Sequence, residues 1–168
     1  MDENNKSGIE VVTRVKAFVI NSKNEILVAW SYGGVQLVGG HVENDEDLSI
    51  AMIREVKEES GIELDEKDEI KAFFELRHPY SKKFSNGRLR ESRIVYYMVR
   101  TDKSPNLSKM QLTKREIENE LKIEFVSMAD FENLCKHTVD NNAKEVNRII
   151  AKEMLTAFDE LKKILRLS

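Results

Sequence analysis

The chain has 168 residues, and this length predicts one domain (1–168) with its own hydrophobic core. Its net charge of −3 gives no general attraction to nucleic acid or anionic membranes, and no apolar run approaches the roughly 18 residues of a membrane span. A single cysteine, Cys135, excludes an internal disulfide bond and, without a targeting pattern, favours a cytoplasmic location.

The first part of the chain predicts a flexible tail followed by three strands. Residues 1–8 are polar and acidic, which is typical of a frayed tail and not of a signal peptide. Turn residues at 21–24 separate two runs rich in β-branched and apolar residues, as in a hairpin. The predicted strands are 11–20, 25–30 and 35–38. The third strand runs directly into Gly39 and Gly40.

A helix is predicted from Asp47 to Ser60, where the spacing of apolar residues changes to the helical period. Its core side is predicted to hold Leu48, Ile50, Ala51, Met52, Ile53 and Val56. Asp45, Glu46 and Asp47 bring negative charge to the N-terminal end, where the helix dipole favours it. Gly61 is suited to the C-terminal stop.

The remaining chain predicts three more strands and further helices. The strands are 70–77, 92–100 and 121–126, and a polar loop over 78–91 joins the first two. Residues 128–136 look helical, and 142–165 predict a long amphipathic helix in the C-terminal part (139–168). The helix stripe contains Val146, Ile149, Ile150, Met154, Phe158, Leu161 and Leu165. The element order predicts an α/β fold with a mixed sheet, and the long helix leaves monomer and homodimer open.

Three carboxylates in the predicted helix point to metal chemistry. Glu55, Glu58 and Glu59 stand at i, i+3 and i+4, which places them on one helix face. Like charges this close destabilise a helix, so a hard cation such as Mg²⁺ is their natural partner. Arg54 could orient one carboxylate through a bidentate hydrogen bond. The alternative interpretation is a solvated, charged helix face.

Residues Gly40 to Ile62 fit the pattern G-x5-E-x7-R-E-U-x-E-E-x-G-U, where U is apolar. The matching positions are Gly40, Glu46, Arg54, Glu55, Val56, Glu58, Glu59, Gly61 and Ile62. This run resembles the signature of the Nudix hydrolases (MutT-like), which cut a nucleoside diphosphate linked to another group. The resemblance implies an α/β/α sandwich over about residues 10–135. Only Gly39–Ile62 carries a specific match, and it disfavours the solvated-face interpretation.

The resemblance also implies a metal site. The implied ligands of Mg²⁺ or Mn²⁺ are the side chains of Glu55, Glu58 and Glu59 and the carbonyl oxygen of Gly39. Glu46 and Arg54 would fix the ligand helix on its loop. Many members have Pro and Gly where this chain has Val38 and Asp45, and these departures concern the shape of the loop.

The implied mechanism is metal-assisted hydrolysis, in which a cation activates water and others neutralise the diphosphate. Glu58, Glu59 and Arg54 are the catalytic candidates in the signature. A general base is expected there or on a later loop, where Glu116, Glu118 and Glu120 precede the last strand. We take Glu118 and Glu120 as the candidates on this loop, with a charged surface turn as the alternative.

Substrate contacts are predicted on either side of the signature. His41 could line the diphosphate site, and Trp30 and Tyr32 could sandwich a nucleobase, although a tryptophan at a strand end is more often core. Arg88 and Arg90 belong to a basic segment that could close over phosphates, or could be a solvated loop.

The expected partner is therefore a small-molecule nucleotide; a membrane is not expected, and nucleic acid is disfavoured. Predicted substrates are nucleotide sugars, dinucleoside polyphosphates and (deoxy)nucleoside triphosphates. Alternatives are a nucleotide-sensing Nudix module that binds without cutting and an RNA 5′-end pyrophosphohydrolase, which the basic segment at 82–93 favours and the acidic balance disfavours. An isopentenyl-diphosphate isomerase would need a catalytic cysteine, and nothing in the sequence places Cys135 beside the signature.

Overall fold

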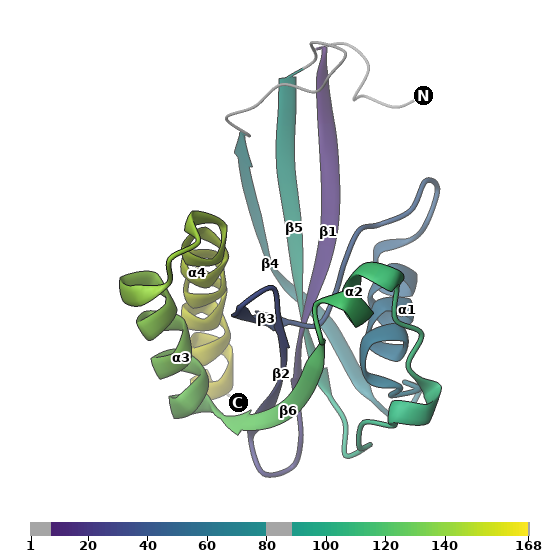
Figure 1. Cartoon of the computed structure of the whole chain (residues 1–168). Coiled ribbons are helices and arrows are strands. Elements are labelled where there is room, and N and C mark those ends of the chain that lie inside the picture. Colours follow the sequence, from purple (N-terminus) through teal and green to yellow (C-terminus); the bar gives the residue numbers. More distant parts are fainter. Residues whose placement is uncertain (1–7, 80–88, 168) are drawn as a thin grey trace.

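The computed structural model describes residues 8–79 and 89–167, and it contains one sheet flanked by helices (Figure 1). The strands are β1 (Ile9–Ile20), β2 (Glu25–Ser31), β3 (Gly34–Leu37), β4 (Glu69–Pro79), β5 (Leu89–Arg100) and β6 (Lys122–Ser127). The helices are α1 (Leu48–Ser60), α2 (Lys114–Glu118), α3 (Met128–Asn141) and α4 (Glu145–Leu167), with a 3₁₀ turn η2 (Leu107–Lys109).

The sheet is mixed, as predicted. Its order is β3-β2-β1-β5-β4, and β6 pairs with β2. Only the β1–β5 pair is parallel among the described strand pairs, running from Ile9 opposite Leu89 to Ile20 opposite Arg100. β2 meets β1 only at the hairpin end, so the chain after β3 takes its place beside β1. This stretch carries Gly39 and Gly40 along β1, because Val38 pairs with Ala17 and His41 pairs with Arg14.

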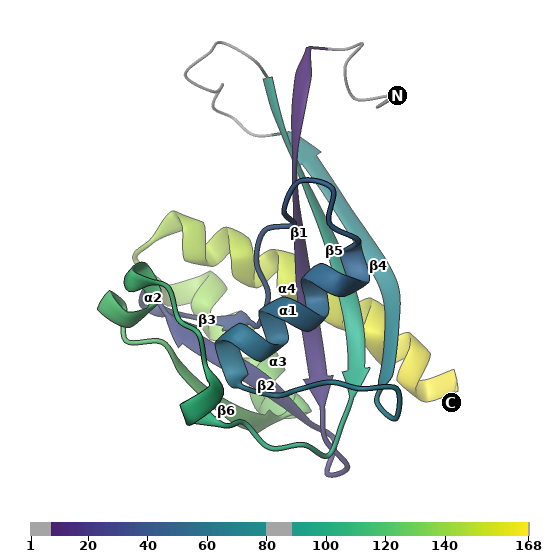
Figure 2. The ribbon, with the colours of Figure 1, turned by 90° about the vertical axis from the view of Figure 1, so that its right-hand side faces the viewer.

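Helices cover both faces of the sheet, which confirms the α/β/α arrangement. Figure 2 shows α1 in front of the strands, and α3 and α4 lie on the opposite face. Side chains alternate along β1, so one set packs with α1 and the other with α3 and α4. The α1 core includes Val15, Ala17, Val19, Met52 and Val56. The other core includes Phe18, Ile20, Phe131, Cys135, Met154, Phe158 and Leu161.

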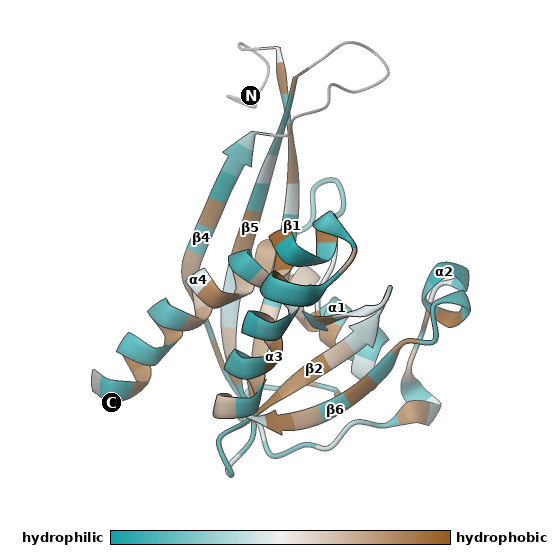
Figure 3. Cartoon of the chain, turned by 60° about the vertical axis from the view of Figure 1, so that its left-hand side comes forward, coloured by the Kyte–Doolittle hydropathy of each residue, from teal (hydrophilic) through white to brown (hydrophobic). Residues whose placement is uncertain are grey.

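Two helix faces differ from the prediction. Ile50 is 59% exposed, because it lies two positions before buried Met52 and therefore about 200° around α1 from the core side. Val146 and Ile149 at the start of α4 are also exposed, since Asn147 takes the inward position there. Ala151 and Ala157 are buried on α4 in their place (Figure 3 shows hydrophilic and hydrophobic positions alternating along this helix).

Several boundaries also differ from the prediction. β1, β4 and β5 each begin earlier than expected or run further, and α3 continues to Asn141, well past the predicted end at residue 136. The short helix α2 and the turn η2 are additional elements. The predicted loop at 78–91 is strand up to Pro79 and from Leu89, and residues 80–88 lie outside the described residues. Among residues 8–79 and 89–167, none of the helices combines the length and apolar character needed to cross a membrane.

Candidate active site

The ends of α1 fix the carboxylates beside the loop that follows β3. Asp47 caps the helix, since its side chain accepts a hydrogen bond from the Ser49 N–H (2.8 Å). Gly61 ends the helix at φ 69°, and a Cβ at this position would collide with the carbonyl oxygen of Asn106. The chain after β5 is held against α1 in the same region, because the Gln111 N–H donates to the Glu58 carbonyl oxygen (2.8 Å).

The peptide groups of Gly39 connect this helix to the sheet. The Gly39 N–H donates to Glu59 Oε2 (2.9 Å), and the Gly39 carbonyl oxygen accepts from Lys16 Nζ (3.1 Å). Lys16 also donates to the carbonyl oxygen of Leu37 (3.1 Å). Gly39 has φ 137°, and a side chain there would collide with the carbonyl oxygen of Val15, so only glycine fits.

Gly40 leaves room for one of the carboxylates. A Cβ at Gly40 would lie 2.5 Å from Glu55 Oε1 and 2.7 Å from Glu55 Oε2, much closer than ordinary contacts. The Glu55 carboxylate therefore rests directly against the backbone of this loop. Gly39 thus lets the loop lie against β1, and Gly40 lets it lie against the Glu55 carboxylate of α1.

Arg54 joins the loop and the carboxylates. Its guanidinium donates twice to Glu46, from Nε to Oε1 (2.8 Å) and from Nη2 to Oε2 (2.9 Å). Its Nη1 reaches Glu55 Oε1 (2.9 Å) and Glu58 Oε2 (3.3 Å), and its Nη2 donates to the His41 carbonyl oxygen (3.0 Å). These contacts tie α1 to the loop before it, and the role of Arg54 and Glu46 in fixing a metal-ligand helix stays a prediction.

The loop between Gly40 and α1 makes one of its turns at Asp45. This residue has φ 62°, the left-handed conformation that favours glycine. The departure of the sequence from the usual signature at Asp45 therefore falls on a residue with the backbone conformation that glycine favours. Aspartate tolerates this conformation better than most residues do.

Burial governs the charges of this site. It raises the pKa of Glu59 to about 7, although the Lys16 charge and the Gly39 N–H act in the opposite direction. Burial likewise raises the pKa of Glu55, and it lowers the pKa of Lys16. Glu58 is the most accessible of the three carboxylates, with a side chain 33% exposed against 11% for Glu55. A cation at this place would compensate the buried negative charge.

The donor set suits a hard divalent ion. Carboxylate and carbonyl oxygens are the ligands that Mg²⁺ and Mn²⁺ prefer, and Glu55, Glu58, Glu59 and Gly39 supply them on adjoining surfaces. Within residues 8–79 and 89–167, no three His, Cys, Asp or Glu side chains are already grouped as a metal site. Arg54 and the Gly39 N–H take up oxygens of these carboxylates, so the side chains would have to reorient to bind an ion.

The three glutamates proposed near the last strand differ in their surroundings. Of these three glutamates, Glu116 is the one whose charge is among the causes that raise the pKa of Glu59. Its carboxylate also accepts from the Thr113 N–H (2.6 Å) in the capping box of α2. Glu118 is exposed beside Lys114 (3.8 Å), and Glu120 is exposed at φ 51°. The assignment of a general base to Glu118 or Glu120 stays a prediction.

The predicted substrate-binding residues are divided between different surfaces. His41 lies in the loop beside β1, opposite Arg14, and Arg90 lies on β5. Tyr32 forms the β2–β3 turn, where the Arg115 guanidinium lies 5.4 Å from its ring centroid. Trp30 packs with the α3–α4 core, on the face opposite α1, and donates to Glu124 (2.6 Å). Arg88 lies outside the described residues.

Lys16 is the residue of this site that the sequence did not single out. Its signal is a charged residue in the middle of a strand whose neighbours are core residues. Cys135, by contrast, is buried among the α3–α4 core as expected, and burial raises the pKa of its thiol to about 12. It lies on the other face of the sheet from the carboxylates, which disfavours the isomerase alternative.

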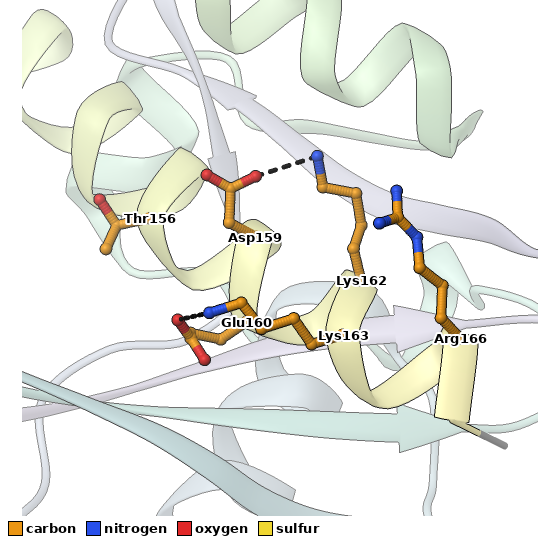
Figure 4. Close-up of a pocket in the computed structure, with 6 residues that line it drawn as sticks. All are labelled: Thr156, Asp159, Glu160, Lys162, Lys163 and Arg166. Atoms are coloured by element: carbon orange, nitrogen blue, oxygen red, sulfur yellow. Dashed lines mark hydrogen bonds and ion pairs between the residues drawn. The ribbon is translucent and has the colours of Figure 1, made fainter.

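A separate hollow on α4 has no comparable chemistry. Figure 4 shows that its side chains come from that one helix: Thr156, Asp159, Glu160, Lys162, Lys163 and Arg166. Lys162 pairs with Asp159 (2.9 Å) and Lys163 with Glu160 (2.7 Å), so these charges neutralise each other along the helix.

Comparison with known proteins identifies the class of this site. Residues 11–149 match the family model for the NUDIX domain. The chain therefore belongs to the Nudix family, and the predicted class, a pyrophosphohydrolase, is confirmed at this level. None of the curated proteins compared with the chain matches it.

Solved structures show the same fold. A MutT protein from Methanosarcina mazei superposes with a TM-score of 0.58 at 18% identity, covering 91% of this chain and 96% of that chain. A MutT protein from a study of Aliivibrio salmonicida and Vibrio cholerae gives 0.52 at 23% identity, covering 86% and 96%. The Escherichia coli dihydroneopterin triphosphate pyrophosphohydrolase gives 0.54 at 14% identity, covering 84% and 92%. At these identities the likeness concerns the fold.

Proposed function

We propose that this protein is a metal-dependent hydrolase that cleaves the diphosphate bond of a nucleoside diphosphate derivative. Substrates of this kind are nucleotide sugars, dinucleoside polyphosphates and (deoxy)nucleoside triphosphates. The observation that carries the proposal is the contact between α1 and the Gly39–Gly40 loop. There Glu59 accepts from the Gly39 N–H and Glu55 lies against Gly40, and Arg54 holds both Glu55 and Glu58.

Mg²⁺ or Mn²⁺ would be held by the three carboxylates and the Gly39 carbonyl oxygen. When bound, such an ion supplies an activated water and neutralises charge on the diphosphate. Arg54 and Glu46 keep the ligand helix in register with the loop through their paired hydrogen bonds. Glu59 and Glu55 are buried against the loop, while the side chain of Glu58 is more exposed.

Proton transfer from the attacking water needs a carboxylate within reach of the metal ligands. Glu118 and Glu120 are our candidates from the sequence. Glu116 joins them because its charge acts on Glu59 and because α2 is held near α1 through the Gln111–Glu58 hydrogen bond. Single Glu→Gln changes at these three positions would separate them, since the true base is expected to lower kcat with little change in KM.

The first experiment is a substrate panel with Mg²⁺. It contains ADP-ribose, diadenosine polyphosphates, NADH, nucleotide sugars, (deoxy)nucleoside triphosphates and 5′-triphosphate RNA, with products separated by chromatography. Glu58→Gln is the test variant. Glu63→Gln is its matched control, because Glu63 is an exposed glutamate just beyond α1 that pairs with Lys109 (3.0 Å).

Cleavage at a diphosphate bond by the wild type and by Glu63→Gln, but not by Glu58→Gln, is the expected result. Cleavage that survives in Glu58→Gln would contradict the role of the α1 carboxylates. A folded protein that binds Mg²⁺ and nucleotide but cleaves nothing in the panel would contradict hydrolysis. That last result would favour the nucleotide-sensing module.

A further inference from the structure

Lys16 of β1 places a positive charge against the backbone of the carboxylate site. Its ammonium group donates to the carbonyl oxygens of Leu37 and Gly39, at 3.1 Å each. The Gly39 N–H in turn donates to the Glu59 carboxylate on α1 (2.9 Å). One peptide segment of the loop therefore lies between a lysine of the sheet and a buried carboxylate of the helix.

Backbone hydrogen bonds attach the loop to β1 on both sides of Lys16. The Ala17 N–H donates to the Val38 carbonyl oxygen (3.0 Å). The Val15 N–H donates to the Gly40 carbonyl oxygen (3.0 Å). Both bonds join main-chain atoms, so they do not depend on the side chain that stands between them. The hydrogen bonds of the ammonium group are therefore not required to place the loop on the strand.

The surroundings of Lys16 are costly for a positive charge that has no negative charge nearby. The residue is partly buried, and burial lowers the pKa of its ammonium group. The charges of Glu59 and Glu55 act in the opposite direction, ahead of a smaller contribution from Glu153, while Arg14 acts with the burial. A methionine of similar length would avoid this cost, so the charge of the lysine calls for a reason beyond packing. Its main electrostatic partners are the two buried carboxylates of the site.

A divalent ion at the carboxylates would act on the same oxygen as Lys16. A carbonyl oxygen has two lone pairs, and the ammonium group uses one of them at Gly39. An ion on the other lone pair would meet a like charge at the same atom, and like charges at such short range repel. Lys16 also balances part of the negative charge of Glu59 and Glu55, which reduces their attraction for an ion. Both effects weaken metal binding.

We propose that Lys16 is a resident cation of the metal site, whose fixed charge keeps the affinity for Mg²⁺ or Mn²⁺ below that of the carboxylates alone. It acts through the Gly39 carbonyl oxygen and through the charges of Glu55 and Glu59, and not through contact with the substrate. The inference rests on the proposed function, because it takes these groups as the metal ligands. Its consequence is a site that exchanges metal ions more readily than three carboxylates would on their own.

The test combines calorimetric titration of the whole chain with Mg²⁺ and thermal melting in EDTA. Lys16→Met removes the charge and both hydrogen bonds, and it keeps a stem of similar length. Lys16→Gln removes the charge but keeps a side-chain N–H donor. Lys71→Met is the matched control, because Lys71 is an exposed lysine in the middle of β4, opposite Met98 of β5.

We expect both Lys16 variants to bind Mg²⁺ about tenfold more tightly than the wild type and Lys71→Met do, because a repelling charge is lost. In EDTA, Lys16→Met should melt at a lower temperature than the wild type, since the buried carboxylates lose their counter-charge. Addition of Mg²⁺ should then raise the melting temperature of this variant by more than it raises that of the wild type. A lysine with a merely structural role would lower the melting temperature without tightening Mg²⁺ binding.

Equal Mg²⁺ affinity in the wild type and both Lys16 variants would overturn the inference. Weaker binding by the variants would overturn it as well, since the ammonium group would then be holding the carbonyl oxygen in place for the ion. Loss of folding in both variants would assign Lys16 to the stability of the fold instead. Absence of Mg²⁺ binding to the wild type would overturn the inference together with the metal site of the proposed function.

The first three of these results do not depend on catalysis, so the substrate panel with Glu58→Gln tests the proposed function separately. Hydrolysis in the panel together with equal Mg²⁺ affinities would leave the hydrolase in place and remove Lys16 from its metal site.

Discussion

Adding one methyl group at Gly40 should impair the metal site while leaving the stability of the fold nearly unchanged. In Gly40→Ala the new Cβ would lie 2.5 Å from Glu55 Oε1 and 2.7 Å from Glu55 Cδ. Ordinary contacts begin near 3.4 Å, so the carboxylate would have to retreat by about 0.7–0.9 Å. This movement would also disturb the 2.9 Å hydrogen bond from Arg54.

The size of the effect follows from this displacement. A misplacement of about 1 Å at a reacting centre can lower the rate by about 100-fold, which corresponds to about 2.7 kcal/mol of activation free energy. We therefore expect kcat/KM to fall by about 100-fold and Mg²⁺ affinity to fall with it. The backbone of Gly40 does not have a positive φ, so alanine introduces no backbone strain. The free energy of unfolding should change by only about 1 kcal/mol, or 2–4 °C in Tm.

The assay combines Mg²⁺ titration by calorimetry, steady-state kinetics on the substrate found in the panel, and thermal melting. Gly39→Ala is the comparison, because its φ of 137° and its collision with the Val15 carbonyl oxygen affect backbone atoms. That variant should lose stability as well as activity. The reasoning is refuted if folded Gly40→Ala keeps wild-type Mg²⁺ affinity and kcat/KM, or if its Tm falls as far as that of Gly39→Ala.

Three further outcomes are expected. Arg54→Lys keeps the charge but loses the paired hydrogen bonds to Glu46, so kcat/KM should fall roughly 10–100-fold with an unchanged circular dichroism spectrum; unchanged kinetics would contradict the role of the guanidinium. Burial raises the pKa of Glu59 from 4.5 to about 7. Between these two pH values, and without metal, Glu59 keeps its proton in the folded protein and loses it in the unfolded chain. The contribution of Glu59 to the free energy of unfolding therefore falls as the pH rises from 4.5 to about 7. Mg²⁺ should consequently raise Tm more above pH 7 than near pH 5, and an equal rise at both would contradict this shift. Gly61→Ala places a side chain at φ 69° against the Asn106 carbonyl oxygen and should lower stability by about 1–3 kcal/mol in thermal melts, whereas a wild-type Tm would show that α1 can end without glycine.

Elements with strong local signals could be predicted from the sequence. The carboxylate helix was expected over 47–60 and is observed over Leu48–Ser60, because its apolar period, acidic start and terminal glycine all lie within one short segment. The fixed spacing within a helix also placed Glu55, Glu58 and Glu59 on neighbouring positions of one face. Local pattern was sufficient for these features.

Features that depend on contacts between distant segments could not be predicted in this way. Strand alternation did not reveal which face of the sheet α1 covers, so the sequence left open that Trp30 packs on the opposite face from the carboxylates. The contacts of Lys16 join residues 21 and 23 positions apart. The inward face of α4 depends on Asn147, whose amide donates to the Tyr32 carbonyl oxygen across 115 positions, and this contact leaves Ile149 in solvent.

The peptide groups of Gly39 connect α1 with β1 and thereby link the carboxylate site to Lys16. Glu59 holds the N–H from α1, and Lys16 holds the carbonyl oxygen from the strand face that packs toward α4. Because the same carbonyl oxygen is an expected metal ligand, the ammonium group of Lys16 and a bound ion would compete for its lone pairs and repel each other.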